Sequence, residues 1–284
     1  MNDPKITVSI PATSANLGPG FDSFGIALKL ANQVTVKKTE KLQKLPVMMR
    51  EVATLFFSIA DIIPFSFSVE IQGDIPSSRG LGSSATVRLG MLLGLNELTQ
   101  NHLTSSDLYR LAVSLEGHAD NAAAALLGGF TIARAHYEPL RHELSPELRF
   151  ILLIPDFSVS TTSARNLLPK IISIADAAAN AADAAVIAAA FATGKYQLLR
   201  GAFHDRLHQP FREPLVPYLS KALVAAESVG ALGGWLSGSG STIAALAENE
   251  AIAQDVVSVF QQIAPRESQC IITHVDNEGA KILL

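Results

Sequence analysis

The stretch IPSSRGLGSSAT, residues 75–86, constrains the fold most, because it places glycines and serines between a predicted strand and a predicted helix. Residues 65–71 alternate apolar and polar side chains, which predicts a strand. Residues 84–98 are almost uniformly apolar, which predicts a buried helix. The first N–H groups of a helix lack partners and carry partial positive charge, so they attract anions. The stretch therefore indicates either a phosphate site or a plain glycine turn.

Glycines in such a loop let backbone N–H groups approach a ligand without interference from a Cβ atom. Ser83 and Ser84 supply hydroxyl groups, and one of them is expected to cap the helix that follows. Gly80 to Ala85 also fits the dinucleotide pattern G-x-G-x-x-A, but eight residues separate Ile71 from Gly80. A dinucleotide turn follows its strand directly. No Gly-Lys-Ser/Thr follows either, which excludes a Walker loop.

Composition bounds the class of protein. The chain has 284 residues with 48% hydrophobic residues and a net charge of −4. This length suggests one large or two ordinary domains, and the acidic balance offers no argument for nucleic-acid binding. The one cysteine, Cys270, cannot form an internal disulfide. No secretory h-region and no uncharged run long enough to span a bilayer is present, so we expect a cytoplasmic protein with no membrane partner.

Strands and helices alternate irregularly along the chain, which predicts an α+β fold of two domains, residues 1–148 and 149–284. The helix near residue 105 is expected to begin with Ser105 or Ser106 as its N-cap. A run of alanines from 175 to 192 is read as a helix, because alanine has the highest helix propensity. Further strands are expected at 5–10, ending at Pro11, and at 33–38, 130–135, 149–155 and 268–276. Further helices are expected at 47–63, 121–129, 215–230 and 250–264.

Three more polar stretches interrupt this pattern: PATSANLGPGFDSFG at 11–25, EGHADN at 116–121 and GWLSGSGSTI at 234–243. Asn16 and Asp22 in the first stretch are candidates for contact with a ligand. The second stretch gathers four polar side chains within six residues at a helix junction: Glu116, His118, Asp120 and Asn121. Each stretch alone is also compatible with an ordinary loop.

Taken together, these stretches resemble the GHMP kinases. IPSSRGLGSSAT is similar to the motif P-x-x-x-G-L-G-S-S-A, which forms the ATP phosphate loop of that family. LSGSGSTI is similar to its third motif, although Ser241 stands where proline is common. Within the family, residues 11–25, EGHADN, STTSARNLLP at 160–169 and HQPFREPLVP at 208–217 most resemble the homoserine kinases.

The resemblance implies an N-terminal domain like domain 2 of ribosomal protein S5 and a ferredoxin-like C-terminal domain, with the site between them. It implies transfer of phosphate from ATP to L-homoserine, a step toward threonine, by a homodimer. Mg²⁺ is expected on Glu116 and a hydroxyl of the loop, with Ser84 as the assigned ligand. The nucleotide-binding residues implied by the motif are Pro76, Ser78, Arg79, Gly80, Leu81, Gly82, Ser83, Ser84 and Ala85.

Homoserine has an ammonium group, a carboxylate and the reacting hydroxyl, and the matched motifs offer a partner for each. Asp22 and Asn16 are the candidates for the ammonium, while Arg165 and Arg212 are the candidates for the carboxylate, which arginine can bind through two hydrogen bonds. His118 and Asp120 are expected in the same pocket. The assigned catalytic residues are Arg165 and Asn121; because an amide cannot take up a proton, Asn121 is expected to orient the hydroxyl.

Two alternatives remain at this point. One is a GHMP kinase for another small alcohol such as mevalonate, which has no ammonium group to match the carboxylates. The other is a sensor of ATP or an amino acid that has lost catalysis; a damaged phosphate loop or a missing Glu116 would favour it. An RNA-binding role, suggested only by the S5-like domain, conflicts with the acidic balance.

Overall fold

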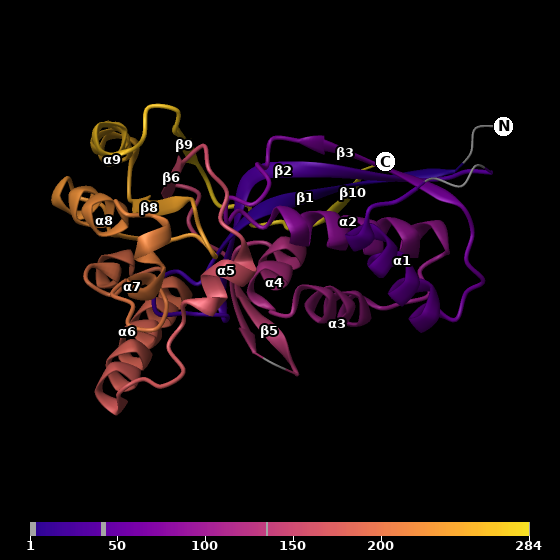
Figure 1. The fold of residues 1–284 in the computed structure, drawn as a ribbon, viewed down its shortest axis with the longest axis horizontal. Coiled ribbons are helices and arrows are strands. Elements are labelled where there is room, and N and C mark those ends of the chain that lie inside the picture. Colours follow the sequence, from indigo (N-terminus) through magenta and orange to yellow (C-terminus); the bar gives the residue numbers. More distant parts are fainter. Residues whose placement is uncertain (1–3, 41–43, 135, 284) are drawn as a thin grey trace.

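The structure is a computed structural model that describes residues 4–40, 44–134 and 136–283. The described residues form two antiparallel sheets, which Figure 1 shows side by side with helices on their faces. The first sheet has the order β10-β1-β2-β4-β5 with β3 also paired to β2, and the second has the order β7-β8-β6-β9. This mixture of sheets and helices confirms the predicted α+β class.

The strands are β1 (Lys5–Ala15), β2 (Phe24–Lys38), β3 (Phe67–Gly73), β4 (Phe130–Arg134), β5 (Tyr137–His142), β6 (Arg149–Ile154), β7 (Gly233–Leu236), β8 (Ile243–Ala247), β9 (Gln269–Thr273) and β10 (Lys281–Leu283). The helices are α1 (Val47–Ala60), α2 (Ser83–Leu98), α3 (Ser105–Glu116), α4 (Asp120–Leu127), α5 (Thr161–Asn166), α6 (Ile174–Thr193), α7 (Gln209–Arg212), α8 (Leu219–Ser228) and α9 (Glu250–Ile263). Two short 3-10 helices are η1 (Tyr196–Leu199) and η2 (Glu213–Leu215).

Helices α1 to α4 cover one face of the first sheet (Figure 1). Helix α2 lies closest to the strands because two glycines face β2. A Cβ atom on Gly90 would lie 2.6 Å from the Val34 side chain, and one on Gly94 would lie 2.7 Å from Val36. This close packing holds α2 directly against β2.

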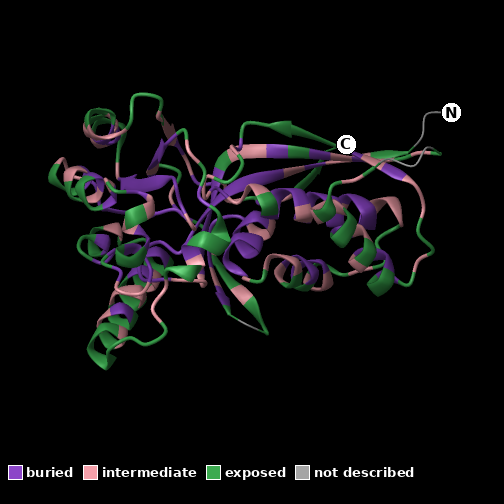
Figure 2. Ribbon diagram, in the orientation of Figure 1, coloured by how far each residue is buried: buried purple, intermediate pink, exposed green. Residues whose placement is uncertain are grey.

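A second core joins the two sheets. One face of the second sheet, with Phe150 and Trp235, packs against Phe130 of the first sheet and Phe191 of α6. The opposite face packs against α8 and α9. Figure 2 shows the buried residues gathered along the strands and where the two sheets meet. Loops from both sheets are thereby held against each other at this junction.

Three predictions about individual elements were wrong. The first strand does not end at Pro11: β1 continues to Ala15, and a shift of its register against β2 between Pro11 and Ala12 accommodates the proline. The N-cap of α3 is Thr104, whose hydroxyl accepts a hydrogen bond from the Asp107 N–H. No serine caps α2, because its N-cap is Gly82 in a left-handed conformation.

The chain crosses from the first sheet to the second between β5 and β6, close to the predicted boundary at residue 148. The last strand, β10, returns to pair with β1 in the first sheet. The division into residues 1–148 and 149–284 therefore stays a prediction.

Within the described residues, α6 is the one helix long and apolar enough to cross a membrane, judged by length and composition alone. Its side chains at Ile187, Ala190 and Phe191 are buried in the core between the sheets. Apart from these residues and Asn180, the helix is partly or fully exposed.

Candidate active site

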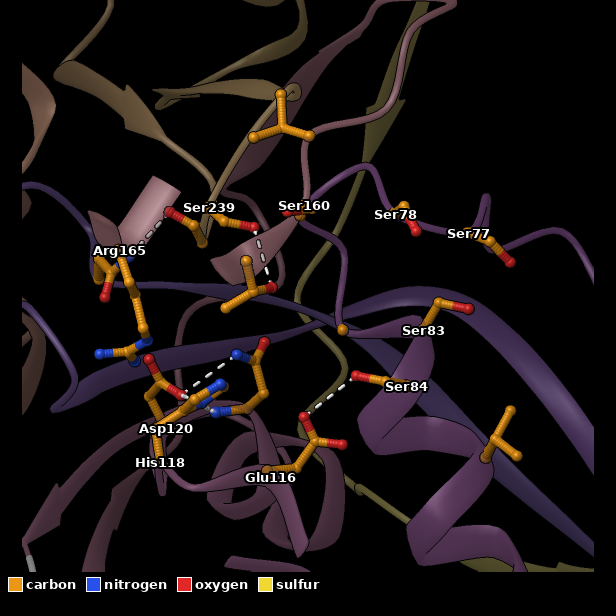
Figure 3. A pocket seen from close by; sticks show the side chains of 18 of the residues that line it. Ser77, Ser78, Ser83, Ser84, Glu116, His118, Asp120, Ser160, Arg165 and Ser239 are labelled. Carbon is orange, nitrogen blue, oxygen red and sulfur yellow. Dashed lines mark hydrogen bonds and ion pairs between the residues drawn. The ribbon is translucent and has the colours of Figure 1, made fainter. Parts of the chain in front are cut away.

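A cavity of about 540 Å³ opens where the two sheets meet. It brings together residues of the loop after β1, the start of α2, the end of α3, and α4, α5 and α7, which Figure 3 shows converging from both halves of the chain. The predicted site residues that line it are Asn16, Asp22, Ser78, Gly80, Gly82, Ser83, Ser84, Glu116, His118, Asp120, Asn121, Arg165 and Arg212.

Four residues assigned to the nucleotide do not line the cavity. Leu81 and Ala85 are buried and support the loop from behind. Arg79 turns away, since its Nε donates to the carbonyl of Pro155 and its guanidinium pairs with Asp156. Pro76 precedes the loop and is likewise absent from the cavity lining.

The glycines of the predicted phosphate loop are required by close packing as well as by their conformation. Gly80 and Gly82 have φ values of +77° and +69°, in the left-handed region that favours glycine. A Cβ atom on Gly80 would lie 2.1 Å from the carbonyl oxygen of Ser237. One on Gly82 would lie 2.0 Å from Oγ1 of Thr13. The loop therefore lies directly against the stretches 11–25 and 234–243.

Hydrogen bonds connect the stretches 11–25, 75–86 and 234–243. The Trp235 indole donates to Oγ of Ser14 (2.9 Å), Ser14 lies 2.8 Å from Oγ of Ser237, and Ser237 donates to the Gly80 carbonyl (2.6 Å). Because both outer bonds have fixed direction, the Ser14 hydroxyl must donate to Ser237. The start of α2 has no capping side chain, so its first N–H groups are open to an anion in the cavity.

Glu116 lies beside the start of α2. Oγ of Ser84 donates to one carboxylate oxygen of Glu116 over 3.0 Å, the contact drawn in Figure 3. Arg88, one turn further along α2, forms an ion pair with the other oxygen. A hydroxyl and a carboxylate are hard oxygen donors of the kind that Mg²⁺ takes, alongside water and substrate phosphates. The donor set therefore fits the predicted magnesium ion.

Asp120 orients two neighbours at the start of α4. Its Oδ1 lies 2.9 Å from Nδ1 of His118 and accepts from Nδ2 of Asn121 over 3.1 Å. The hydrogen bond to Asp120 is the main cause that raises the pKa of His118. On the other side, the Thr13 hydroxyl donates to Oδ1 of Asn121 over 2.6 Å. These two partners fix which end of the Asn121 amide is oxygen and which is nitrogen.

Arg165 and Asp22 form a bidentate ion pair, with N–O distances of 2.9 and 2.7 Å. Asp22 has a φ of +53°, and its N–H donates to Oδ1 of Asn16. The two residues predicted to bind opposite ends of the substrate are therefore bonded to each other across 143 residues of sequence. Hydrogen bonding to Asp22 also raises the pKa of Arg165.

Arg212 is 2% exposed, and its Nη1 donates to the Gly238 carbonyl over 2.9 Å. Its Nε is buried with no partner. Burial is the main cause that lowers the pKa of Arg212 to about 10. Phe21 lies under both guanidinium groups, 5.5 Å from Arg165 and 5.3 Å from Arg212. A buried cation with a free donor can bind an anionic group of a ligand strongly.

His208 contacts the guanidinium group of Arg212 and holds it in place. Its Nδ1 lies 3.2 Å from Nη1 of Arg212, and its Nε2 lies 2.9 Å from the Gly18 carbonyl. Arginine can only donate, so Nδ1 accepts and Nε2 has the proton, which makes the ring neutral. Burial, reinforced by the Arg212 charge, lowers the pKa of His208 to about 4, although Asp205 and Asp22 oppose the shift.

Acid is therefore expected to destabilise the fold through His208. The folded-state pKa is below the unfolded value, so the neutral ring stabilises fully above pH 6.5 and the benefit is lost as pH falls toward 4. Between pH 7.5 and 5, the free energy of unfolding should fall by roughly 1–2 kcal/mol more than in His208→Gln. Urea unfolding, followed by the fluorescence of the single tryptophan, measures this. Equal acid sensitivity of both proteins would contradict the assignment.

Sequence reasoning missed several contributors. Thr13, Ser14 and Phe21 lie inside the stretch 11–25, but nothing in their spacing indicates which neighbours they contact. Arg88 lies in a segment that is otherwise almost uniformly apolar, and nothing in that pattern indicates its contact with Glu116. Their partners are distant in sequence, so no local pattern could have identified them.

Comparisons with known proteins agree with this geometry. The family description "GHMP kinases N terminal domain" matches residues 47–129, and "GHMP kinases C terminal" matches residues 187–265. The chain is 38% identical to a homoserine kinase of Clostridium beijerinckii, covering 98% of both chains. It is 36% identical to the homoserine kinase of Desulfitobacterium hafniense, over 98% of this chain and all of that one.

Among solved structures, the homoserine kinase from Cytophaga hutchinsonii superposes with a TM-score of 0.90 at 27% identity, covering 100% of this chain and 98% of that one. A mevalonate kinase superposes with a TM-score of 0.73 at 14% identity, covering 96% and 99%, a likeness of fold alone. The matches in sequence extend over nearly the full length of both chains. The chain therefore belongs to the GHMP kinase family, in its homoserine kinase branch.

Proposed function

We propose that this protein transfers the γ-phosphoryl group of ATP to the hydroxyl of L-homoserine, giving ADP and O-phospho-L-homoserine. One observation supports this most directly: a single cavity joins an uncapped helix N-terminus to a pair of carboxylates and a pair of guanidinium groups. The helix N-terminus suits phosphates. The carboxylates of Asp22 and Asp120 and the guanidinium groups of Arg165 and Arg212 suit a small molecule that has both an ammonium and a carboxylate.

The triphosphate would lie along the loop at Ser78 to Ser84, where the N–H groups at the start of α2 face the cavity. Ser84 and Glu116 would hold Mg²⁺, which supplies positive charge to the phosphate oxygens when bound. The apolar end of the cavity, formed by Met48, Ile71 and Val87, is the proposed place of the adenine.

The adenine assignment has its own test. Ile71 is 41% exposed although it is apolar, as expected of a residue that a ligand covers. Ile71→Asp is expected to raise the KM for ATP at least about tenfold and leave the KM for L-homoserine unchanged, because it places a charge against an apolar ring. Ile63→Asp is the matched control, since Ile63 is 89% exposed and outside the cavity. Equal effects of both variants would reject the assignment.

At the other end, the substrate carboxylate would bind Arg212 and Arg165, and its ammonium would take the place of Arg165 on Asp22. Each charged end of the substrate thus replaces one partner of the ion pair seen in the structure. The hydroxyl would donate to Oδ1 of Asn121, whose orientation Thr13 and Asp120 fix. Phosphoryl transfer has a loose transition state, so the hydroxyl proton can leave late, to phosphate or solvent, without a base.

The experiment is ADP release from ATP and Mg²⁺ with L-homoserine, mevalonate, L-serine or no acceptor. ADP formation with L-homoserine alone is the expected result. ADP formation with mevalonate instead would indicate a GHMP kinase for another alcohol. Measurable ATP binding with no ADP from any acceptor would favour the sensor.

We further propose that the enzyme works in the cytoplasm as a homodimer, as the family resemblance implies. Ile171, just before α6, and Ile174, its first residue, are 88% and 89% exposed, and a second copy would shield such side chains from water. Sedimentation equilibrium is expected to give twice the mass of one chain, and a single-chain mass would reject the dimer.

A further inference from the structure

Glu116 is held by two residues of one helix. Ser84 and Arg88 lie one turn apart on α2 and bind different oxygens of its carboxylate. The Glu116 side chain is 5% exposed and that of Arg88 is 16% exposed. An ion pair this deep is weakly screened by water and salt, so the charge of Glu116 is largely compensated before any ligand arrives.

Among the described residues, no lysine or arginine lines the phosphate end of the cavity. The described residues that line it are serines and glycines between Ser77 and Ser84, together with Glu116. Arg79 points away toward Asp156, and Arg165 and Arg212 lie at the opposite end with Asp22. Only backbone N–H groups and the partial positive charge of the α2 N-terminus would face the full negative charges of the nucleotide phosphates there.

The metal end is similarly incomplete. Among the described residues, no group of three or more histidines, cysteines, aspartates or glutamates could hold a metal ion. Only two residues, Ser84 and Glu116, supply donor oxygens, whereas Mg²⁺ prefers about six ligands. Arg88, bound to the same carboxylate, repels a divalent cation. Without the nucleotide, the protein is thus a poor site for the metal. Without the metal, it is a poor site for the nucleotide.

We propose that Arg88 couples metal binding to nucleotide binding: its ion pair with Glu116 keeps a divalent cation from binding until nucleotide phosphates supply the missing oxygens and negative charge. This inference rests on the proposed use of ATP with Mg²⁺. Coupling is reciprocal, so the metal must strengthen nucleotide binding by the same factor as the nucleotide strengthens metal binding. Arg88 is a positioning residue here, since it acts through Glu116.

The test titrates Mn²⁺ into the whole protein and measures free Mn²⁺ by electron paramagnetic resonance, with and without ADP, so no turnover is needed. Each titration is corrected by the same titration without protein, because ADP itself binds Mn²⁺. Wild type is expected to bind Mn²⁺ at least about 100-fold more tightly when ADP is present. Arg88→Gln keeps a hydrogen-bond donor but removes the charge. In the absence of ADP, this variant is expected to bind Mn²⁺ at least about tenfold more tightly than wild type does. The gain in Mn²⁺ affinity on adding ADP should therefore be smaller in the variant.

Two variants serve as controls. Arg88→Lys keeps the charge and is expected to follow wild type. Arg110→Gln removes an exposed arginine that pairs with Glu138 at 3.5 Å on α3, outside the cavity, and is expected to change nothing. Circular dichroism and the fluorescence of Trp235 report whether each variant is folded.

Unchanged or weaker Mn²⁺ binding by folded Arg88→Gln would overturn the inference and leave Arg88 as an orienting residue only. If that variant does not fold, the wild-type titration still decides: a Kd for Mn²⁺ below about 100 μM without ADP contradicts the proposed restraint. A different failure would concern the proposed function itself, namely no Mn²⁺ binding by wild type even with saturating ADP.

Discussion

Replacing Arg165 by methionine is expected to lower kcat/KM for L-homoserine by roughly 10²- to 10⁴-fold, because two charge-assisted hydrogen bonds to the substrate carboxylate are lost. Methionine keeps the unbranched apolar part of the side chain while removing all five donors. The affinity for ATP should stay unchanged, since Arg165 lies at the end of the cavity away from the phosphate loop.

A substrate without the carboxylate makes this prediction specific. 3-Amino-1-propanol keeps the hydroxyl and ammonium of homoserine but lacks the carboxylate. Wild type should therefore use it poorly. Arg165→Met should use it no worse than wild type does, because Asp22 is freed from its ion pair and can still bind the ammonium. An equal loss with both substrates would show that Arg165 acts on the fold or the chemical step. Arg134→Met, an exposed arginine stacked on Tyr137, is the matched control.

The ion pair between Asp22 and Arg165 also shows where sequence reasoning stopped. Both residues were recognised as site residues from their motifs, and the cavity contains both. Their mutual contact was not predicted, because it depends on how α5 meets the loop after β1. That arrangement follows from the core shared by Phe130, Phe150 and Phe191, which involves three separate elements.

The glycines of the phosphate loop show a second limit. Their pattern predicted a loop and a helix start, and α2 begins at Ser83. The expected reason was access for a ligand, whereas the structure shows that Gly80 and Gly82 also make room for Ser237 and Thr13. Sequence shows that a Cβ is absent from a position. It does not show which atom, brought there by tertiary packing, requires the absence.

Helix propensity and strand patterns predicted elements correctly where the local sequence pattern was strong. They failed where pairing with a distant strand determines the extent of an element. The alanine-rich segment is helix α6, as its propensity predicts. By contrast, β1 runs through Pro11 because β2 pairs with it on both sides of the register shift. Strand β10 has three residues and little pattern of its own, and its existence depends on the exposed edge of β1.

The orientation of the Asn121 amide leads to the second large expected effect. Nδ2 of Asn121 donates to the Asp120 carboxylate over 3.1 Å, and Oδ1 accepts from Thr13 over 2.6 Å. Removing the Thr13 donor should therefore loosen the group that orients the hydroxyl. Thr13→Val is expected to lower kcat about tenfold with little change in the KM for ATP, whereas Thr13→Ser, which keeps the hydroxyl, should remain near wild type.

Asn121→Asp is expected to lower kcat by about 10²-fold near pH 8, although it introduces a potential base beside the reacting hydroxyl. The new carboxylate would face Asp120 at the place where an N–H donor now lies, and two carboxylates that close cannot both ionise freely. Its pKa should rise, and the protonated form resembles the amide in shape and in having a donor. Activity of the variant should therefore recover as pH falls from 8 toward 6, while Asn121→Ala stays low throughout. A pH profile of kcat distinguishes the cases: higher turnover than wild type, lost on acidification, would mean that an ionised base helps this reaction and that the base-free mechanism is wrong.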